Sequence, residues 1–363
     1  MRRIIALLFC MLFLVVGCSW MKSSEKEEKN DEAREVMVNI HEEVEVIADQ
    51  LQIPWSIEKH NDTFFLTERP GAIVKIEGGN VDRQEVKLKK KLATAQEAGL
   101  LGFVLSPDFE KTKTAYAYYT YEDSSGQFNR IVTLTLKDDV WTEEKVLLDR
   151  IPSGSWHHGG RLKIGPDEKL YATAGDAYIE EIAQDVDSLG GKILRLNLDG
   201  SIPSDNPIAE SYIYSYGHRN PQGLTWDEDG TLYSSEHGNN ANEEINRIEV
   251  GKNYGWPIIE GNEEQEGMVT PIFTSGPDKT WAPSGMDMDG DKLYVAALRG
   301  TALLEFDMET GQYREVVSDL GRLRDVFIED EYLYFISNNT DGRGSAENKD
   351  DKLYRISLSI LTN

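Results

Sequence analysis

Residues that could do chemistry gather in four short segments, and the first of these contains two adjacent histidines. WHHGGRL (156–162) places His157 and His158 in a Gly-rich stretch. A histidine in such a loop is accessible and close to backbone groups, which suits a general base that must meet a substrate. Two adjacent histidines could also be metal ligands or a plain surface pair, and the segment alone leaves these interpretations open.

A second segment, SYGHRNPQGLTW (215–226), combines an arginine with an amide. Arg219 and Asn220 stand before a proline, so their backbone is expected to be extended or turning rather than helical. A planar guanidinium beside an amide can hold an anion or a developing oxyanion. The alternative is a structural role in which Arg219 bridges neighbouring sheets.

A third segment, GRLRDV (321–326), carries a pair of arginines. In a strand, Arg322 and Arg324 project from the same face. Two like charges side by side repel each other, so the pair implies a shared anionic partner. That partner is either a carboxylated ligand or acidic residues of the next sheet.

The fourth segment, SEHGNNANEEINRIEVGKNYGWP (235–257), is rich in oxygen-bearing groups. It offers carboxylates, amides, a tyrosine and backbone carbonyls in a Gly-rich loop. Calcium takes six to eight such hard oxygen ligands. The spacing does not match an EF-hand, and a solvated acidic loop is the alternative.

A recurring strand pattern must position these segments. From about residue 40 onward, a polar turn with Asp, Asn or Gly precedes a short strand rich in Tyr, Leu, Val and Phe, as in GPDEKLYATAG (165–175) and DMDGDKLYVAA (287–297). Six such units at intervals of roughly 40–60 residues predict a radial repeat. The expected fold is all-β: a six-bladed β-propeller with four-stranded antiparallel blades. A large sandwich or a β-helix is the competing all-β fold.

The N-terminus has the features of a targeting signal. Residues 1–17 contain Arg2 and Arg3, then an apolar run, then Val-Val-Gly before Cys18, which is typical of a lipoprotein signal peptide. We therefore expect a lipid on Cys18, a charged disordered tether over 18–38 and a catalytic domain over 39–363. An ordinary signal peptide or an uncleaved anchor is the alternative. The expected location is extracytoplasmic, on the outer face of the cell membrane.

The charge of the chain excludes one class of partner. With 38 basic and 64 acidic side chains the formal net charge is −26, and so acidic a surface repels nucleic-acid phosphates. The two cysteines, Cys10 and Cys18, both lie at the N-terminus, so the expected domain has no disulfide.

Taken together, the motifs resemble those of the PQQ-dependent soluble aldose sugar dehydrogenases, within the glucose/sorbosone dehydrogenase family. The resemblance runs over about 45–355 and is carried by SYGHRNPQGL, SEHG, EEIN and NYGWP in this order, with AGLLGFVLSPDF (98–109) and SLGGKILRLNLDGSIPSDNP (188–207). It implies a six-bladed propeller that binds pyrroloquinoline quinone (PQQ) and Ca²⁺ and oxidises aldose sugars. An external electron acceptor is then also implied.

The resemblance also implies roles for individual residues. His157 resembles the general base, Asp176 the acid that orients it, and Arg219 and Asn220 the residues at the quinone oxygens. Arg322 and Arg324 resemble the pair that holds the cofactor carboxylates. The carbonyls of Gly238 and Asn239 resemble ligands of the cofactor's calcium, and Glu243, Glu244 and Tyr254 resemble ligands of a second, structural calcium.

Four positions depart from the family pattern. Glu97 stands at a cofactor contact where several relatives have glutamine, Arg299 where glucose-oxidising relatives have lysine, and Asn239 where they have proline. Trp156 precedes the base where they have aspartate, and its flat face is expected to stack on the sugar ring. These changes bear on sugar specificity more than on the class of reaction.

Hydride transfer needs a cofactor, and no GxGxxG segment follows a strand here, so a quinone fits better than a nicotinamide. The competing functions are a calcium-dependent lactone hydrolase and a non-enzymatic propeller that binds a glycan or a protein. The paired arginines favour the dehydrogenase, because neither alternative needs them.

Overall fold

Short antiparallel strands dominate the part of the chain that the computed structural model describes, residues 42–361. Contacts group the residues from Glu45 onward into one unit. The expected signal peptide, Cys18 and the tether over 18–38 lie outside the described residues. Within 42–361, none of the helices is long and apolar enough to cross a membrane.

Four of the sheets contain four strands each, and neighbouring strands in them are antiparallel. The four sheets, in strand order, are β1 (Glu45–Ala48), β24 (Leu353–Ser357), β23 (Tyr332–Ser337) and β22 (Leu323–Glu329); β10 (Leu162–Ile164), β11 (Leu170–Ala174), β12 (Lys192–Leu196) and β13 (Ile213–Tyr216); β14 (Pro221–Trp226), β15 (Leu232–Glu236), β16 (Glu244–Ile248) and β17 (Phe273–Thr274); and β18 (Pro283–Asp289), β19 (Lys292–Ala297), β20 (Ala302–Asp307) and β21 (Gln312–Val317). Most of these strands are buried over several consecutive residues, and β11, β12 and β15 are buried along their whole length. The alternation expected from the sequence over 192–198 is therefore wrong for residues 192–196, because neighbouring sheets cover both faces of the strand.

The remaining sheet has eight strands and consists of two antiparallel runs joined edge to edge. The junction is parallel, and there residues 85–87 pair with residues 140–142. Its order is β2 (Pro54–His60), β3 (Thr63–Glu68), β4 (Ala72–Glu77), β5 (Asn80–Lys87), β9 (Val140–Pro152), β8 (Gly126–Lys137), β7 (Thr114–Asp123) and β6 (Leu100–Leu105). The described helices are short: α2 (Phe109–Thr112), the 3₁₀ helix η1 (Glu180–Ala183) and α3 (Leu358–Leu361).

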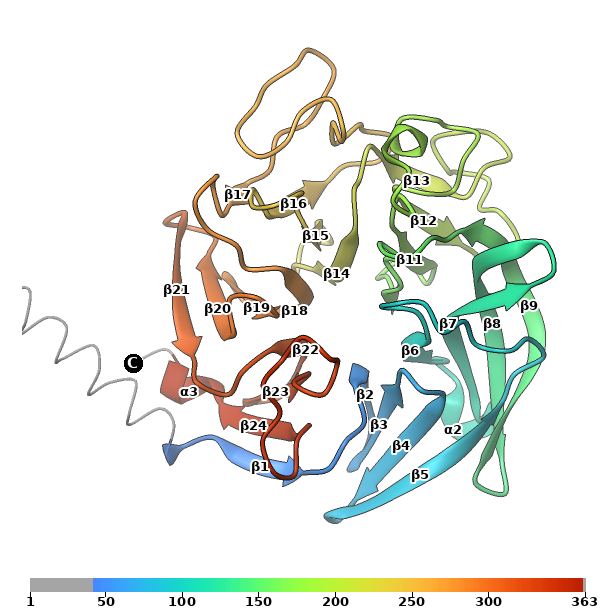
Figure 1. Ribbon diagram of the computed structural model, residues 1–363, viewed down its shortest axis with the longest axis vertical. Helices are drawn as coiled ribbons and strands as arrows, with labels where there is room; N and C mark the ends of the chain where they lie inside the picture. The colour runs from blue at the N-terminus through green and yellow to red at the C-terminus, as the bar shows by residue number, and fades with distance from the viewer. Residues whose placement is uncertain (1–41, 362–363) are drawn as a thin grey trace, which may run out of the picture. The chain divides into compact units, whose positions relative to one another are not determined.

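The sheets are arranged radially around a central axis, as in a propeller (Figure 1). The first strand of each antiparallel run lies innermost, and these strands touch one another in the cyclic order β2, β6, β10, β14, β18, β22 and back to β2. The ring is closed by β1, which pairs with β24 at the outer edge of the last sheet. The expected all-β fold is therefore confirmed, and four of the five described sheets have the expected four antiparallel strands.

Apolar side chains fill the space between neighbouring sheets. One cluster joins Tyr118 and Ile131 of one sheet to Leu170 and Leu194 of the next. Because both faces of the inner strands are covered, β6 and β11 are buried along their whole length. This packing fixes the ends of the inner strands, and the loops there carry the candidate site.

Candidate active site

His157 is oriented by a buried carboxylate. Its Nδ1 lies 2.7 Å from Oδ1 of Asp176, and the other oxygen of Asp176 accepts a hydrogen bond from Nε1 of Trp256 at 2.9 Å. Asp176 is fully buried. Because a carboxylate only accepts, it assigns the proton to Nδ1 and leaves Nε2 of His157 able to take a proton from a substrate.

The backbone around His157 is unusual. His157 has a φ of 60°, in the left-handed region that non-glycine residues rarely adopt. Gly175 packs against it so closely that a Cβ there would lie 2.1 Å from the carbonyl oxygen of His157. Strain of this kind persists only where the surroundings impose it, and it is common at functional sites.

His158 points elsewhere and has structural partners. Its Nδ1 lies 3.0 Å from Oγ of Ser153, and its Nε2 lies 3.2 Å from the carbonyl oxygen of Gln96. Burial lowers the pKa of His158 to about 4, so the ring is neutral at physiological pH. Because both ring nitrogens of His158 already have partners, His157 is the better candidate for the general base.

Arg219 and Asn220 are held by their backbone and leave side-chain donors unused. Both backbone N–H groups donate to one oxygen of Glu236. The Arg219 guanidinium lies over the ring of Trp256 at 5.2 Å. Among the described residues, neither Nε of Arg219 nor Nδ2 of Asn220 has a hydrogen-bond partner, although both atoms are buried. Buried donors of this kind require a partner, and a ligand can supply it.

Arg322 lies directly before β22 and Arg324 lies within it, beside an irregularity in the pairing between Leu323 and Asp325. The expected common face of the two arginines stays a prediction. Arg322 pairs with Asp341 at 3.0 Å between Nη2 and Oδ2, and its Nε has no partner among the described residues. Arg324 donates only to neutral groups, those of Asn338, Gln222 and Ser284, and it forms no ion pair within residues 42–361. Burial, followed by the nearby Arg343 and Arg322, lowers the pKa of Arg324 well below the usual value. An anionic ligand would stabilise such a buried arginine, because it would supply the missing counter-ion.

Glu97 forms an ion pair with Arg343, a residue that was not predicted from the sequence to belong to the site. Its Oε1 lies 2.7 Å from Nη1 of Arg343, and its Oε2 accepts from the backbone N–H of His157 at 3.4 Å. Burial alone would raise the pKa of Glu97, but Arg343 lowers it to about 2. The Arg343 guanidinium also lies over the ring of Trp156, 5.8 Å from its centroid. The aromatic ring that was expected to stack on the sugar is therefore already in contact with an arginine.

His237 was also missed as an individual residue, although its SEHG motif was noted. Burial lowers its pKa to about 3, and its Nε2 has no partner among the described residues. Its carbonyl oxygen accepts from Nη1 of Arg219 at 3.3 Å. A histidine directly before two expected calcium-binding carbonyls was the signal that could have drawn attention to it.

Arg299 does not join this group through its side chain. It is exposed, and its backbone N–H donates to the carbonyl oxygen of Trp281 at 2.9 Å. Its expected role as a cofactor contact stays a prediction.

The expected side-chain ligands of a second calcium are not brought together. Oxygens of Glu243 accept from Ser275 and from the backbone of Trp281. Glu244 accepts from Gly261, and the hydroxyl of Tyr254 donates to the carbonyl oxygen of Arg247. Consecutive residues entering a strand point to opposite sides, which explains why the two glutamates diverge. Within residues 42–361, no three His, Cys, Asp or Glu side chains are arranged to hold a metal ion.

Gly238 and Asn239 are placed differently. Both lie in the loop between β15 and β16, and Asn239 is exposed. A Cβ on Gly238 would lie 1.9 Å from the carbonyl oxygen of Ala241, so only glycine fits this turn. Their carbonyl oxygens receive no hydrogen bond from the part of the chain that the structure describes, which leaves them available to a cation.

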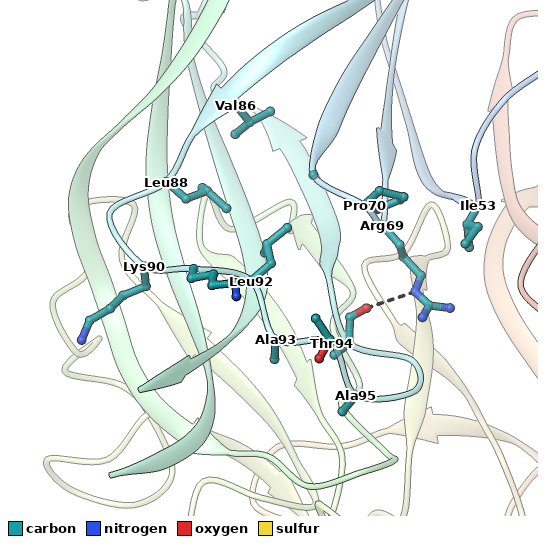
Figure 2. A pocket seen from close by; sticks show the side chains of 13 residues that line it. Ile53, Arg69, Pro70, Val86, Leu88, Lys90, Leu92, Ala93, Thr94 and Ala95 are labelled. Carbon is teal, nitrogen blue, oxygen red and sulfur yellow. Dashed lines mark hydrogen bonds between the residues drawn. The ribbon is translucent and has the colours of Figure 1, made fainter. Parts of the chain in front are cut away.

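Two cavities lie near these residues. The smaller cavity reaches the site at Glu97 and Arg324, and its lining also includes Trp55, Arg69, His158 and Gln222. A larger one of about 600 Å³ lies beside the segment 88–98 and contains none of the predicted site residues. Figure 2 shows Arg69 at the edge of the larger cavity, where its Nε donates to the carbonyl oxygen of Ala98 at 3.2 Å. Arg69 lines both cavities.

Comparison with known proteins places this geometry in context. Residues 51–355 match the family described as Glucose / Sorbosone dehydrogenase. Aldose sugar dehydrogenase YliI of Escherichia coli (strain K12) is 30% identical over 342 residues, which cover 82% of this chain and 91% of that protein. Quinoprotein glucose dehydrogenase B of Acinetobacter calcoaceticus is 36% identical over 212 residues, covering 50% of this chain and 44% of that one. The PQQ-bound form of the aldose sugar dehydrogenase from Streptomyces coelicolor has a TM-score of 0.81 and 33% identity, covering 86% and 97%.

Proposed function

The chain belongs to the glucose/sorbosone dehydrogenase family, and we propose that it oxidises the anomeric carbon of aldose sugars to lactones with bound PQQ as the electron acceptor. The observation that carries the proposal is the group of unsatisfied donors around His157. Arg324 is buried without an ion-pair partner among the described residues, and Nε of Arg219, Nε of Arg322 and Nδ2 of Asn220 are buried without hydrogen bonds. A planar ligand with several carboxylates and quinone oxygens fits this set of donors.

His157 is the general base of the proposed reaction. When bound, PQQ takes up the hydride that leaves the anomeric carbon, which no side chain could accept. Nε2 of His157 takes the proton of the anomeric hydroxyl at the same time. Asp176 holds the imidazole by Nδ1 and stabilises its positive charge once it is protonated.

The arginines hold and polarise the cofactor. Arg322, directly before β22, and Arg324, within it, would bind its carboxylates, and the packing of this strand keeps them in place before the ligand arrives. Arg219 and Asn220 donate to its quinone oxygens, where negative charge develops during the reaction. Reoxidation requires an external electron acceptor.

Calcium forms part of the proposal through the loop between β15 and β16. The carbonyl oxygens of Gly238 and Asn239 would hold Ca²⁺ together with oxygens of the cofactor. Hard oxygen donors of this kind are what Ca²⁺ prefers. Calcium would also offset charge on the cofactor's carboxylates.

We further propose that the two antiparallel runs of the eight-stranded sheet count as separate blades, which gives six blades in all. The parallel pairing of β5 with β9 then joins two blades at their outer edges. The cyclic contact among six innermost strands supports this count.

The reconstitution prediction tests the proposed function. The purified protein without its first 38 residues should reduce a redox dye with aldoses only after addition of PQQ and Ca²⁺. Omission of either should abolish the signal, and added chelator should reverse it. Lactone hydrolysis without PQQ, together with no dye reduction in its presence, would instead establish the calcium-dependent lactone hydrolase. Absence of both activities would favour a glycan- or protein-binding propeller.

A separate proposal concerns location. We propose that Cys18 carries lipid and holds the domain at the outer face of the cell membrane, since the sequence before it is typical of a lipoprotein signal. In a detergent phase partition, the wild-type protein should enter the detergent phase, and the Cys18→Ser variant should stay in the aqueous phase. A variant that still enters the detergent phase would contradict the lipid anchor.

A further inference from the structure

Arg343 connects two carboxylates at the rim of the candidate cofactor site. Its Nη1 lies 2.7 Å from Oε1 of Glu97, and its Nη2 lies 3.2 Å from Oδ2 of Asp341. The same oxygen of Asp341 lies 3.0 Å from Nη2 of Arg322. Arg343 therefore links the loop before β6 to the loop between β23 and β24, and through Asp341 it reaches the expected cofactor arginines.

Glu97 occupies a position that is difficult to reconcile with an anionic ligand. Its side chain lines the small cavity together with Arg324. Its pKa of about 2 means that it is charged at physiological pH. A carboxylate facing the carboxylates of a cofactor would repel them strongly, because the surroundings are buried and screen poorly.

The charges around the cavity show how this repulsion is offset. Arg69, Arg322, Arg324 and Arg343 face Glu97 and Asp341 in this region, so positive charge exceeds negative charge by two. Without Arg343, the excess falls to one and Glu97 loses its ion-pair partner. The anion-binding character of the site thus depends on a residue outside the arginine pair that the sequence singled out.

The loop that carries Arg343 is held in place by its own contacts. Gly344 packs against Arg322 so closely that a Cβ would lie 2.9 Å from its Cδ. At the base of the loop, Oδ1 of Asn339 accepts from the backbone N–H of Arg322 at 2.8 Å. The guanidinium is therefore positioned before any ligand binds, which reduces the ordering required on binding.

We propose that Arg343 is a positioning residue for the anionic cofactor, acting through Glu97: it neutralises this carboxylate and holds it away from the cofactor's negative groups. The proposal rests on the proposed function, because it takes PQQ as the ligand. It predicts that Arg343 is needed only while residue 97 is charged. Glu97 and Arg343 form one functional unit rather than two independent contacts.

A double-mutant cycle in the full propeller domain tests this dependence. PQQ is titrated in the presence of Ca²⁺ into wild type, Glu97→Gln, Arg343→Gln and the double variant, and Kd is measured from the change in absorbance. Arg343→Gln should weaken binding by about 10–100-fold, as expected for coupled residues in contact. Glu97→Gln should bind as tightly as wild type or more tightly. The double variant should return to within about threefold of wild type.

A matched control separates this effect from a general loss of an arginine. Arg355 pairs with Glu45 at the outer edge of the last sheet, so Arg355→Gln should leave Kd unchanged. Thermal unfolding of the apo-proteins identifies any variant that fails to fold. A double variant as weak as Arg343→Gln, or an Arg343→Gln protein that binds like wild type, would overturn the inference while the proposed function stands. A wild-type protein that binds no PQQ would overturn both.

Discussion

His157→Ala should lower kcat by about 10²–10⁴-fold, the effect expected for loss of a general base. The variant should still bind PQQ, because in the proposed site the arginines and Asn220, and not the imidazole, would hold the cofactor. Stopped-flow reduction of the reconstituted protein by aldose measures the chemical step directly. A titration on the same sample measures Kd for PQQ.

His158 provides the comparison for this prediction. His158→Ala removes contacts to Ser153 and Gln96, so it should lower the free energy of unfolding and reduce kcat by less than about tenfold. If His158→Ala lost the larger factor and His157→Ala kept near wild-type kcat, the assignment of the base would be wrong by one residue.

Arg324→Met should abolish tight PQQ binding with little loss of stability. Truncation of one partner in a buried charged contact costs about 2–5 kcal/mol, roughly 30–5,000-fold in Kd. The apo-protein gains by losing a buried charge that has no ion-pair partner among the described residues, which offsets the hydrogen bonds lost to Asn338 and Gln222. PQQ titration and urea unfolding of the apo-protein measure the two effects separately.

Arg161 is the matched control, since it is equally buried but already paired. Its Nη1 lies 2.8 Å from Oδ2 of Asp325, so Arg161→Met leaves a buried carboxylate without its partner. The expected loss is about 3–5 kcal/mol in the free energy of unfolding. Equal destabilisation by the two variants, with unchanged PQQ binding by Arg324→Met, would show that Arg324 is structural.

The radial fold was predictable because its signal is local. Each unit repeats a turn and a short strand rich in Tyr, Leu, Val and Phe, and neither signal depends on distant residues. The pairing of β1 with β24 and the parallel junction of β5 with β9 were not predicted, because the sequence does not reveal which outer edges meet. The first contact closes the ring, whereas the second joins the outer strands of two adjacent antiparallel runs.

In the candidate site, too, local features were predictable from the sequence and contacts between distant segments were not. The pairing of His157 with Asp176 agrees with the resemblance. The common face expected for Arg322 and Arg324 assumed a regular strand, whereas β22 begins only at Leu323 and its pairing shifts register beside Arg324. Arg343 was missed because its partner Glu97 lies 246 residues away in the sequence. Glu243, directly before β16, and Glu244, its first residue, accept hydrogen bonds from different partners. Their expected role at a second calcium stays a prediction.

The most direct test of the central claim is a crystal structure of the protein grown with PQQ and Ca²⁺. The quinone oxygens should lie within hydrogen-bond distance of Nε of Arg219 and Nδ2 of Asn220, with carboxylates at Arg322 and Arg324 and with Nε2 of His157 facing the cofactor. Electron density for PQQ in the larger cavity beside Lys90 and Lys91, or none at the arginine pair, would contradict the account.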